Sequence, residues 1–155
     1  MSMKRRTFLK GTLAAGTVGM AVSAGLLTPR AVMAAWPKEA FEAKSMDAAM
    51  QATVGATGTS AGDITIKAPD IAENGAVVPV TVSTGISGVE SISIFAEQNA
   101  NPLTSSYMLA SNAEPFVSTR IKMGKTSNVI AVVKAGGKLY NASKEVKVTI
   151  GGCGG

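Results

Sequence analysis

Short runs of alternating apolar and polar residues, beginning near residue 64, constrain the fold of this chain more than any other feature of its sequence. Alternation with a period of two gives a β-strand one face for a core and one for solvent. The runs lie at residues 64–67, 78–83, 92–96, 117–123, 129–133 and 145–150. Gly136-Gly137, between the last two runs, has the spacing of a two-residue hairpin loop. The pattern predicts an all-β domain over residues 63–150, built as an immunoglobulin-like antiparallel β-sandwich.

Two local signals refine this prediction. Asn74-Gly75 predicts a turn ahead of the second run. Pro79 has no backbone N–H, so its place inside that run predicts an edge strand or a bulge.

Residues 35–62 are predicted to form an N-terminal helix and a linker. The helix is expected over residues 36–51, with Pro37 in its first turn. The small, polar residues 55–62 (GATGTSAG) are expected to form a loop. Trp36 and Phe41 are equally compatible with packing in the core and with contacts to a partner protein.

Residues 1–34 have the layout of an export signal: a basic start, an uncharged stretch of 17 residues and a small-residue cleavage site. Arg5 and Arg6 lie in the sequence RRTFLK, which resembles the twin-arginine signature, although Lys4 replaces the more usual Ser or Thr. We therefore expect a periplasmic protein exported by the twin-arginine route. The alternative is a membrane anchor, but 17 residues are short for a span, so no stable anchor is expected. Because this route carries folded proteins, we expect a partner to bind before export.

Charge and composition exclude several classes of function. The formal charge is +5, but the first 34 residues contain five of the 15 basic residues and none of the ten acidic ones. The remainder has no net charge, so nucleic-acid binding is not expected. The absence of His and the single Cys exclude His-ligated or thiolate metal sites, a Cys-His pair and an internal disulfide, so no metal or cofactor is expected. Arg120, Lys122 and Lys125 could attract an anion, but a solvated strand face is the favoured interpretation.

Residues 151–155 read Gly-Gly-Cys-Gly-Gly directly after the last strand run, and they include the only cysteine, Cys153. Four glycines, Gly151, Gly152, Gly154 and Gly155, bury no side chain and have much conformational entropy to lose, so we predict a flexible arm with an exposed thiol. Such an arm is narrow enough to enter another protein's active site. No Lys, Arg or His lies within five residues to activate the thiol, which favours a non-catalytic covalent carrier over an enzyme.

Two other functions would also use a cysteine or a Gly-Gly pair at this position. An exported β-sandwich could serve as a binding module that dimerises through a Cys153 disulfide. The terminal Gly154-Gly155 is also typical of ubiquitin-like sulfur carriers, but these need ATP-dependent adenylation and contain a different, helix-bearing fold.

The sequence resembles the SoxY family of sulfur carriers in the bacterial Sox thiosulfate oxidation system. The likeness covers nearly the whole chain after residue 34, and is densest in ENGAVVPVTV (73–82), STRIKM (118–123), GGKLY (136–140) and VKVTIGGCGG (146–155). The resemblance implies an immunoglobulin-like sandwich that forms a heterodimer with a SoxZ-like subunit. It implies that a c-type cytochrome joins Cys153 to thiosulfate as a cysteine S-thiosulfonate, that a manganese hydrolase releases sulfate, and that a sulfur dehydrogenase oxidises the remaining sulfur. Haem and manganese would belong to those enzymes.

Overall fold

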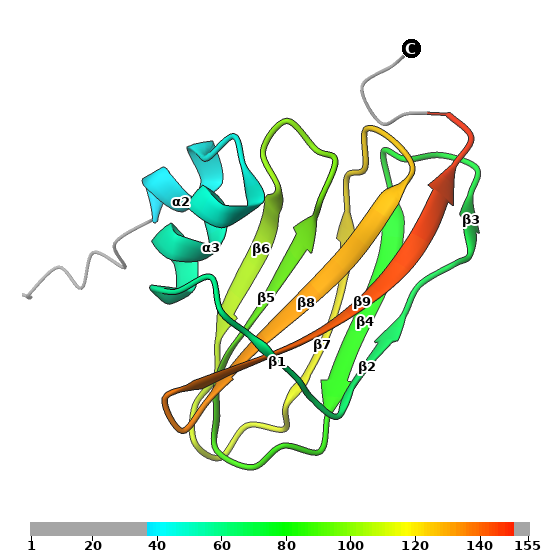
Figure 1. The fold of residues 1–155 in the computed structure, drawn as a ribbon. Helices are drawn as coiled ribbons and strands as arrows, with labels where there is room; N and C mark the ends of the chain where they lie inside the picture. The colour runs from blue at the N-terminus through cyan, green and yellow to red at the C-terminus, as the bar shows by residue number, and fades with distance from the viewer. Residues whose placement is uncertain (1–36, 151–155) are drawn as a thin grey trace, which may run out of the picture. The chain divides into compact units, whose positions relative to one another are not determined.

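The computed structural model describes residues 37–150, which form nine strands and two short helices (Figure 1). The helices are α2 (Lys38–Glu42) and α3 (Met46–Val54). The strands are β1 (Ser60–Ala61), β2 (Ile64–Lys67), β3 (Ile71–Ala72), β4 (Val78–Thr84), β5 (Val89–Ala96), β6 (Leu103–Met108), β7 (Phe116–Ile121), β8 (Ser127–Ala135) and β9 (Lys138–Val148).

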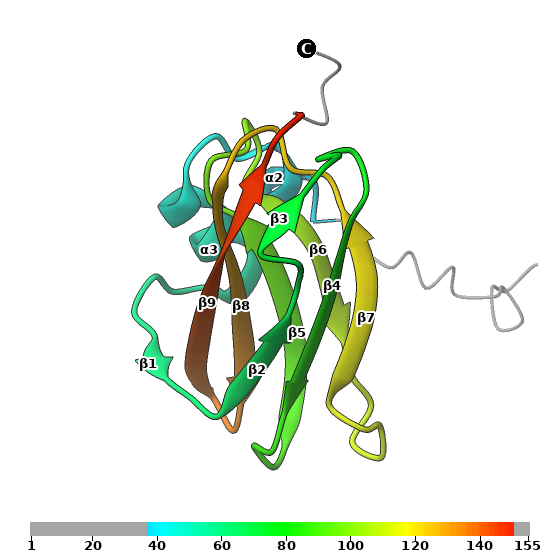
Figure 2. The same cartoon turned by 90° about the vertical axis from the view of Figure 1, so that its right-hand side faces the viewer.

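The strands form two facing sheets, which confirms the predicted all-β, immunoglobulin-like sandwich (Figure 2). The larger sheet has the order β1-β9-β8-β5-β6, with β3 also pairing with β9. The smaller sheet has the order β2-β4-β7. All pairings are antiparallel except those of β1 and β3, which run parallel to β9 at its two ends.

The core between the sheets consists of the inward residues of the alternating runs. On β4 the inward positions Val78, Val80 and Val82 are fully buried, and the intervening Pro79 is exposed. The opposite sheet contributes residues of the same β-branched type, which pack well on a pleated surface. These include Ile92, Ile94, Val129, Val133 and Val146.

A second apolar cluster lies on the outer face of the larger sheet, where α2 and α3 cover it. Ala40, Ala49 and Met50 pack there against Phe95, Leu103 and Val132 of the sheet. β5 is therefore buried on both faces, and Phe95 is fully buried although alternation alone predicts a solvent-facing residue. The covering helices are the reason for the difference.

The single helix expected over residues 36–51 is wrong in its extent, because the chain forms two helices separated at residues 43–45. Ser45 begins the second helix, and its side chain accepts a 3.3 Å hydrogen bond from the Ala48 N–H. An N-cap of this kind satisfies a helix-terminal donor and fixes the start of a helix. Gly55 ends it in the left-handed conformation, with φ of 79°.

The expected loop at residues 55–62 is partly a strand. β1 adds to the edge of β9, and Gly62 N–H donates to the Asn141 carbonyl at 3.3 Å. Strand β6 was not expected at all, because its central residues Thr104, Ser105 and Ser106 provide no apolar alternation. It forms by pairing with β5.

Both turn predictions are consistent with the structure. Gly136 and Gly137 have positive φ of 54° and 74° and join Ala135 to Lys138 in a two-residue hairpin loop. Asn74 closes a turn by accepting from the Ala76 N–H at 2.8 Å. β4 lies at the centre of its sheet, but β2 ends opposite Thr81, so Pro79 has a neighbouring strand on one side only.

Candidate functional site

The residues predicted to carry function lie outside the part of the chain that the structure describes. These are Cys153, Gly151, Gly152, Gly154 and Gly155 of the predicted arm, and Arg5 and Arg6 of the predicted export signal. The described region nearest to Cys153 in sequence is the end of β9, where Thr149 and Ile150 follow the strand. The hydrogen bonds of the last described residues, up to Ile150, fix the point from which the chain continues into residues 151–155.

Backbone hydrogen bonds from the segment around β3 hold one side of this region. Lys147 N–H donates to the Asp70 carbonyl at 3.0 Å, and Thr149 N–H donates to the Ala72 carbonyl at 3.1 Å. The Thr149 hydroxyl donates to the carbonyl of Glu73 at 2.9 Å. The chain is therefore paired with a second strand for two residues beyond the end of the β9–β8 ladder at Val146.

Thr126 holds the other side, where the loop between β7 and β8 leads into β8. Its hydroxyl oxygen accepts from the Val148 N–H at 2.9 Å. The same hydroxyl lies 3.5 Å from the Val148 carbonyl, to which it donates. A side chain thus completes the pairing of Val148 where the β8–β9 ladder has stopped.

Gly75 connects this region to the β7–β8 loop. Its N–H donates to the Ile150 carbonyl at 2.8 Å, and its carbonyl accepts from the Met123 N–H at 2.7 Å. Both Gly75 and Met123 are buried. The last described residue of the chain and the β7–β8 loop are therefore joined through a single residue.

Asn99, which lies in the turn between β5 and β6, holds the β7–β8 loop in place. Its side-chain amide donates to the Lys122 carbonyl at 2.7 Å, and its oxygen accepts from the Gly124 N–H at 2.9 Å. Between these two loops lies a surface hollow of about 500 Å³. It is lined by Gln98, Asn99, Ala100, Asn101, Lys122, Gly124 and Lys125.

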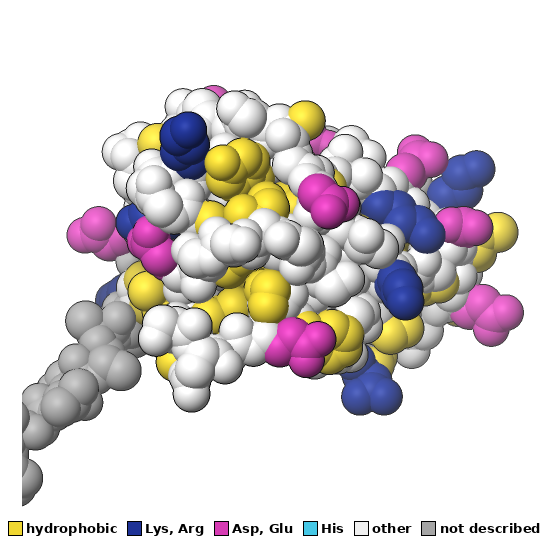
Figure 3. All heavy atoms as spheres, turned by 90° about the horizontal axis from the view of Figure 1, so that it is seen from below, with side chains coloured by type: hydrophobic (Ala, Val, Ile, Leu, Met, Phe, Trp, Pro, Cys, Tyr) yellow, Lys and Arg dark blue, Asp and Glu magenta, His cyan; other side chains and the backbone are white. Residues whose placement is uncertain are grey.

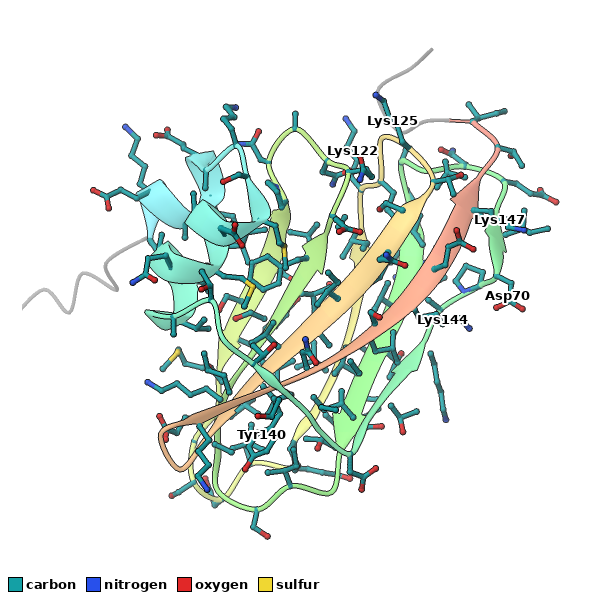
Figure 4. All side chains as sticks on the ribbon, viewed as in Figure 1. Asp70, Lys122, Lys125, Tyr140, Lys144 and Lys147 are labelled. Atoms are coloured by element: carbon teal, nitrogen blue, oxygen red, sulfur yellow. The ribbon has the colours of Figure 1, made fainter. Side chains whose placement is uncertain are left out.

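Side chains at this end of the sandwich are both basic and apolar. Lys122 and Lys125 are exposed near the end of β9, with Lys147 and Asp70 on the β3 side of that strand (Figure 4). Ile71, Val77 and Ile150 are exposed apolar residues of the same region, at 59%, 54% and 62%. Figure 3 shows the opposite end of the sandwich, where basic and acidic side chains are interspersed and form no patch of one sign.

Residues 37–150 contain no group of three or more His, Cys, Asp or Glu that could hold a metal ion. Neither of their two helices is long and apolar enough to cross a bilayer. Of the two candidate partner contacts, Trp36 lies outside the described residues, and Phe41 packs against the cluster under the helices, which supports its assignment to the core.

The sequence reveals the cysteine but not the residues that hold the end of β9 and Ile150 in place. The sequence predicts only a turn at Gly75 and assigns no role to Thr126. Neither hydrogen bond has a sequence signal, because the partners lie 75 and 22 residues apart in the chain. The β3 pairing was also missed, since two residues are too few for alternation to reveal.

Comparison with known proteins identifies relatives for this arrangement. A family model described as sulfur oxidation protein SoxY matches residues 50–153. The solved structure of the sulfur carrier protein SoxY from Chlorobium limicola f thiosulfatophilum is 50% identical, with a TM-score of 0.62. The match covers 68% of this chain and 97% of the Chlorobium chain. No curated protein matches the chain.

A more distant likeness shows the fold alone. A superoxide reductase (neelaredoxin) from Ignicoccus hospitalis is 22% identical, with a TM-score of 0.50. The match covers 57% of this chain and 82% of the neelaredoxin. The sandwich architecture is therefore shared beyond the SoxY proteins.

Proposed function

The chain belongs to the SoxY family of sulfur oxidation proteins, and on this basis we propose that it carries sulfur covalently on Cys153. The proposed carrier is non-catalytic: it presents thiosulfate-derived intermediates to the enzymes of the Sox pathway. Other proteins supply the haem and manganese chemistry.

One observation carries this proposal: the family match extends to residue 153, the only cysteine, and this residue follows the anchored Ile150 by three positions. Three residues span at most about 10 Å when extended. The sulfur is thus tethered to a fixed point at the end of a rigid sandwich.

The proposed loading step forms a bond between the Cys153 sulfur and the outer sulfur of thiosulfate. The thiol proton and two electrons leave, and a c-type cytochrome accepts the electrons. The product is a cysteine S-thiosulfonate. A manganese hydrolase then adds water across the bond to the terminal sulfonate sulfur, releasing sulfate and leaving a persulfide that a sulfur dehydrogenase oxidises.

The proposed setting is the periplasm, reached by the twin-arginine route with Arg5 and Arg6 in the signal. The proposed partner is a SoxZ-like subunit that forms a heterodimer with this chain before export. Co-expression with and without that subunit tests this: normal export of the chain alone would contradict the requirement for a partner.

Intact mass spectrometry of the protein from thiosulfate-oxidising cells tests the carrier function. We expect mass additions of sulfur or thiosulfate that map to Cys153 and that are absent from Cys153→Ser. A reducible dimer without adducts would instead support the alternative, a β-sandwich binding module that dimerises through Cys153. Normal thiosulfate oxidation by Cys153→Ser cells would contradict the carrier function directly.

A further inference from the structure

The two lysines of the β7–β8 loop are exposed and have no acidic partner among the described residues. The ion pairs of residues 37–150 join Lys38 to Glu42, Lys134 to Glu90 and Lys144 to Asp70, and none includes Lys122 or Lys125. Both lysines line the hollow between the β5–β6 turn and the β7–β8 loop. Two unpaired ammonium groups beside one hollow favour the binding of an anion.

The backbone that bears these lysines is held in place. Asn99 binds it at the Lys122 carbonyl and the Gly124 N–H, at 2.7 Å and 2.9 Å. Met123, between them, is fully buried and bonded to Gly75. The backbone of residues 122–124 is therefore fixed, which reduces the entropy lost when the lysine side chains close on a ligand.

Neighbouring charges leave an excess of positive charge at the hollow. Lys44 reaches the same rim, where its ammonium donates to the Asn101 side chain at 3.2 Å. Glu97, on the turn that faces the lysines, accepts from the Asn128 side-chain amide at 3.0 Å. The other acidic residues of the loops at this end are Glu73 and Asp70, and neither lines the hollow. The Glu73 carbonyl accepts from the Thr149 hydroxyl, and the Asp70 carboxylate pairs with Lys144 at 3.0 Å.

The β7–β8 loop, which bears Lys122 and Lys125, is adjacent to Ile150, because Gly75 bonds to both Met123 and Ile150. Cys153 lies within about 10 Å of Ile150 by chain length, and a thiosulfonate extends its side chain further. An anion on Cys153 is therefore tethered within reach of the β7–β8 loop.

Two exposed lysines of β9 also have no ionic partner among the described residues, and they provide internal comparisons. Lys147 lies near the end of the strand but on its β3 side, and it is not among the residues that line the hollow (Figure 4). Lys138 begins this 11-residue strand, so it lies roughly 33 Å from the end where residue 151 follows. Lys147 thus resembles Lys122 and Lys125 in lying near the end of β9, but it is not part of the hollow. Lys138 is neither near that end nor part of the hollow.

From this geometry we propose that Lys122 and Lys125 form a binding site for the terminal sulfonate of a thiosulfonate carried on Cys153. The inference rests on the proposed carrier function and adds to it a docked state of the loaded carrier. Loading places a negative charge on a side chain that is neutral as a thiol, so the contact forms only with the adduct. Hydrolytic removal of the sulfonate as sulfate removes the group that the lysines bind.

The test uses the whole ¹⁵N-labelled chain with Cys153 in three chemical states: free thiol, thiosulfonate and carbamidomethyl. Tetrathionate prepares the thiosulfonate, because the Cys153 thiolate attacks its central S–S bond and releases thiosulfate. Iodoacetamide gives a neutral adduct on the same atom, and mass spectrometry verifies each product. Backbone amide NMR spectra then compare the three states.

We expect thiosulfonate loading to shift the amide resonances of residues 122–126 and Gln98, and the neutral adduct to leave them unchanged. The shifts should disappear in Lys122→Gln/Lys125→Gln and persist in the two controls, Lys147→Gln and Lys138→Gln. They should also disappear at about 1 M salt, where exposed charges are screened over about 3 Å.

The outcomes separate the inference from the proposed function. Loading of Cys153 without shifts at residues 122–126, or shifts that survive in the double lysine variant, would overturn the lysine site and leave the carrier intact. Loss of the shifts in Lys147→Gln would also overturn it, because the anion would then bind on the β3 side. Absence of any adduct on Cys153, in cells and with tetrathionate, would overturn the carrier function and the lysine site together.

Discussion

The backbone N–H of Gly75 donates to the carbonyl of Ile150 at 2.8 Å, across a sequence separation of 75 residues. This bond joins the turn before β4 to the point from which residues 151–155 continue. The Thr149 amide and the Val148 amide are satisfied on either side by Ala72 and Thr126. The proposed sulfur-bearing segment therefore starts from a backbone that is bonded at three consecutive residues.

Thr126→Val tests whether its hydroxyl fixes the end of β9. Valine keeps the branched shape but cannot accept from the Val148 N–H, so the free energy of unfolding should fall by about 1 kcal/mol. Amide hydrogen exchange at Val148 and Thr149 should become faster, while exchange in β5 stays the same. Thr65→Val, on the exposed face of β2, is the control. Unchanged exchange at Val148 would show that another group holds this residue.

Gly152→Val or Gly154→Val should leave the thiol able to accept a sulfur adduct but slow its processing by the partner enzymes. The reason is steric: a side chain widens a segment that is proposed to enter a narrow active site. Turnover of the loaded carrier by each Sox enzyme measures the effect, with the extent of tetrathionate loading as the control for thiol reactivity. Equal turnover of wild type and both variants would remove the steric argument.

The fold was predictable from the sequence wherever strands alternate strictly. β4 shows this best, because its valines repeat every second residue and all face the core. β6 was not predictable, since Thr104, Ser105 and Ser106 carry no periodic signal and become a strand only beside β5. Ser45 did offer a local signal, as an N-cap residue ahead of an apolar helix, and it would have divided the predicted helix correctly.

The site was predictable in its chemistry but not in its surroundings. A unique cysteine among four glycines is a local pattern that the sequence alone reveals. The hydrogen bonds of Gly75 and Thr126, and the position of Lys122 and Lys125 beside the end of β9, depend on contacts between segments distant in sequence. Such contacts follow from tertiary packing, for which propensity and periodicity provide no signal.

Phe95→Ala tests how far the two helices depend on the outer face of β5. Phe95 is fully buried beneath α2 and α3, so truncation should lower the free energy of unfolding by about 3–5 kcal/mol. Phe116→Ala is the matched control, because this residue is 51% exposed and its loss should change stability by only about 0.5 kcal/mol. Urea denaturation of both variants provides the comparison. Equal stability losses would contradict the observed burial.

Two glycines within the predicted linker test whether residues 55–62 belong to the folded domain. A Cβ added at Gly62 would lie 2.7 Å from the Cβ of Tyr140, so Gly62→Ala must displace β1 or the start of β9. Overpacking of this kind costs about 1–3 kcal/mol. Gly58 has nothing within 4 Å of such an atom, and Gly58→Ala should be neutral, or stabilising by up to about 1 kcal/mol because the unfolded chain loses entropy. Thermal unfolding of the two variants measures the difference. If Gly62→Ala were as stable as Gly58→Ala, the segment would not pack on β9.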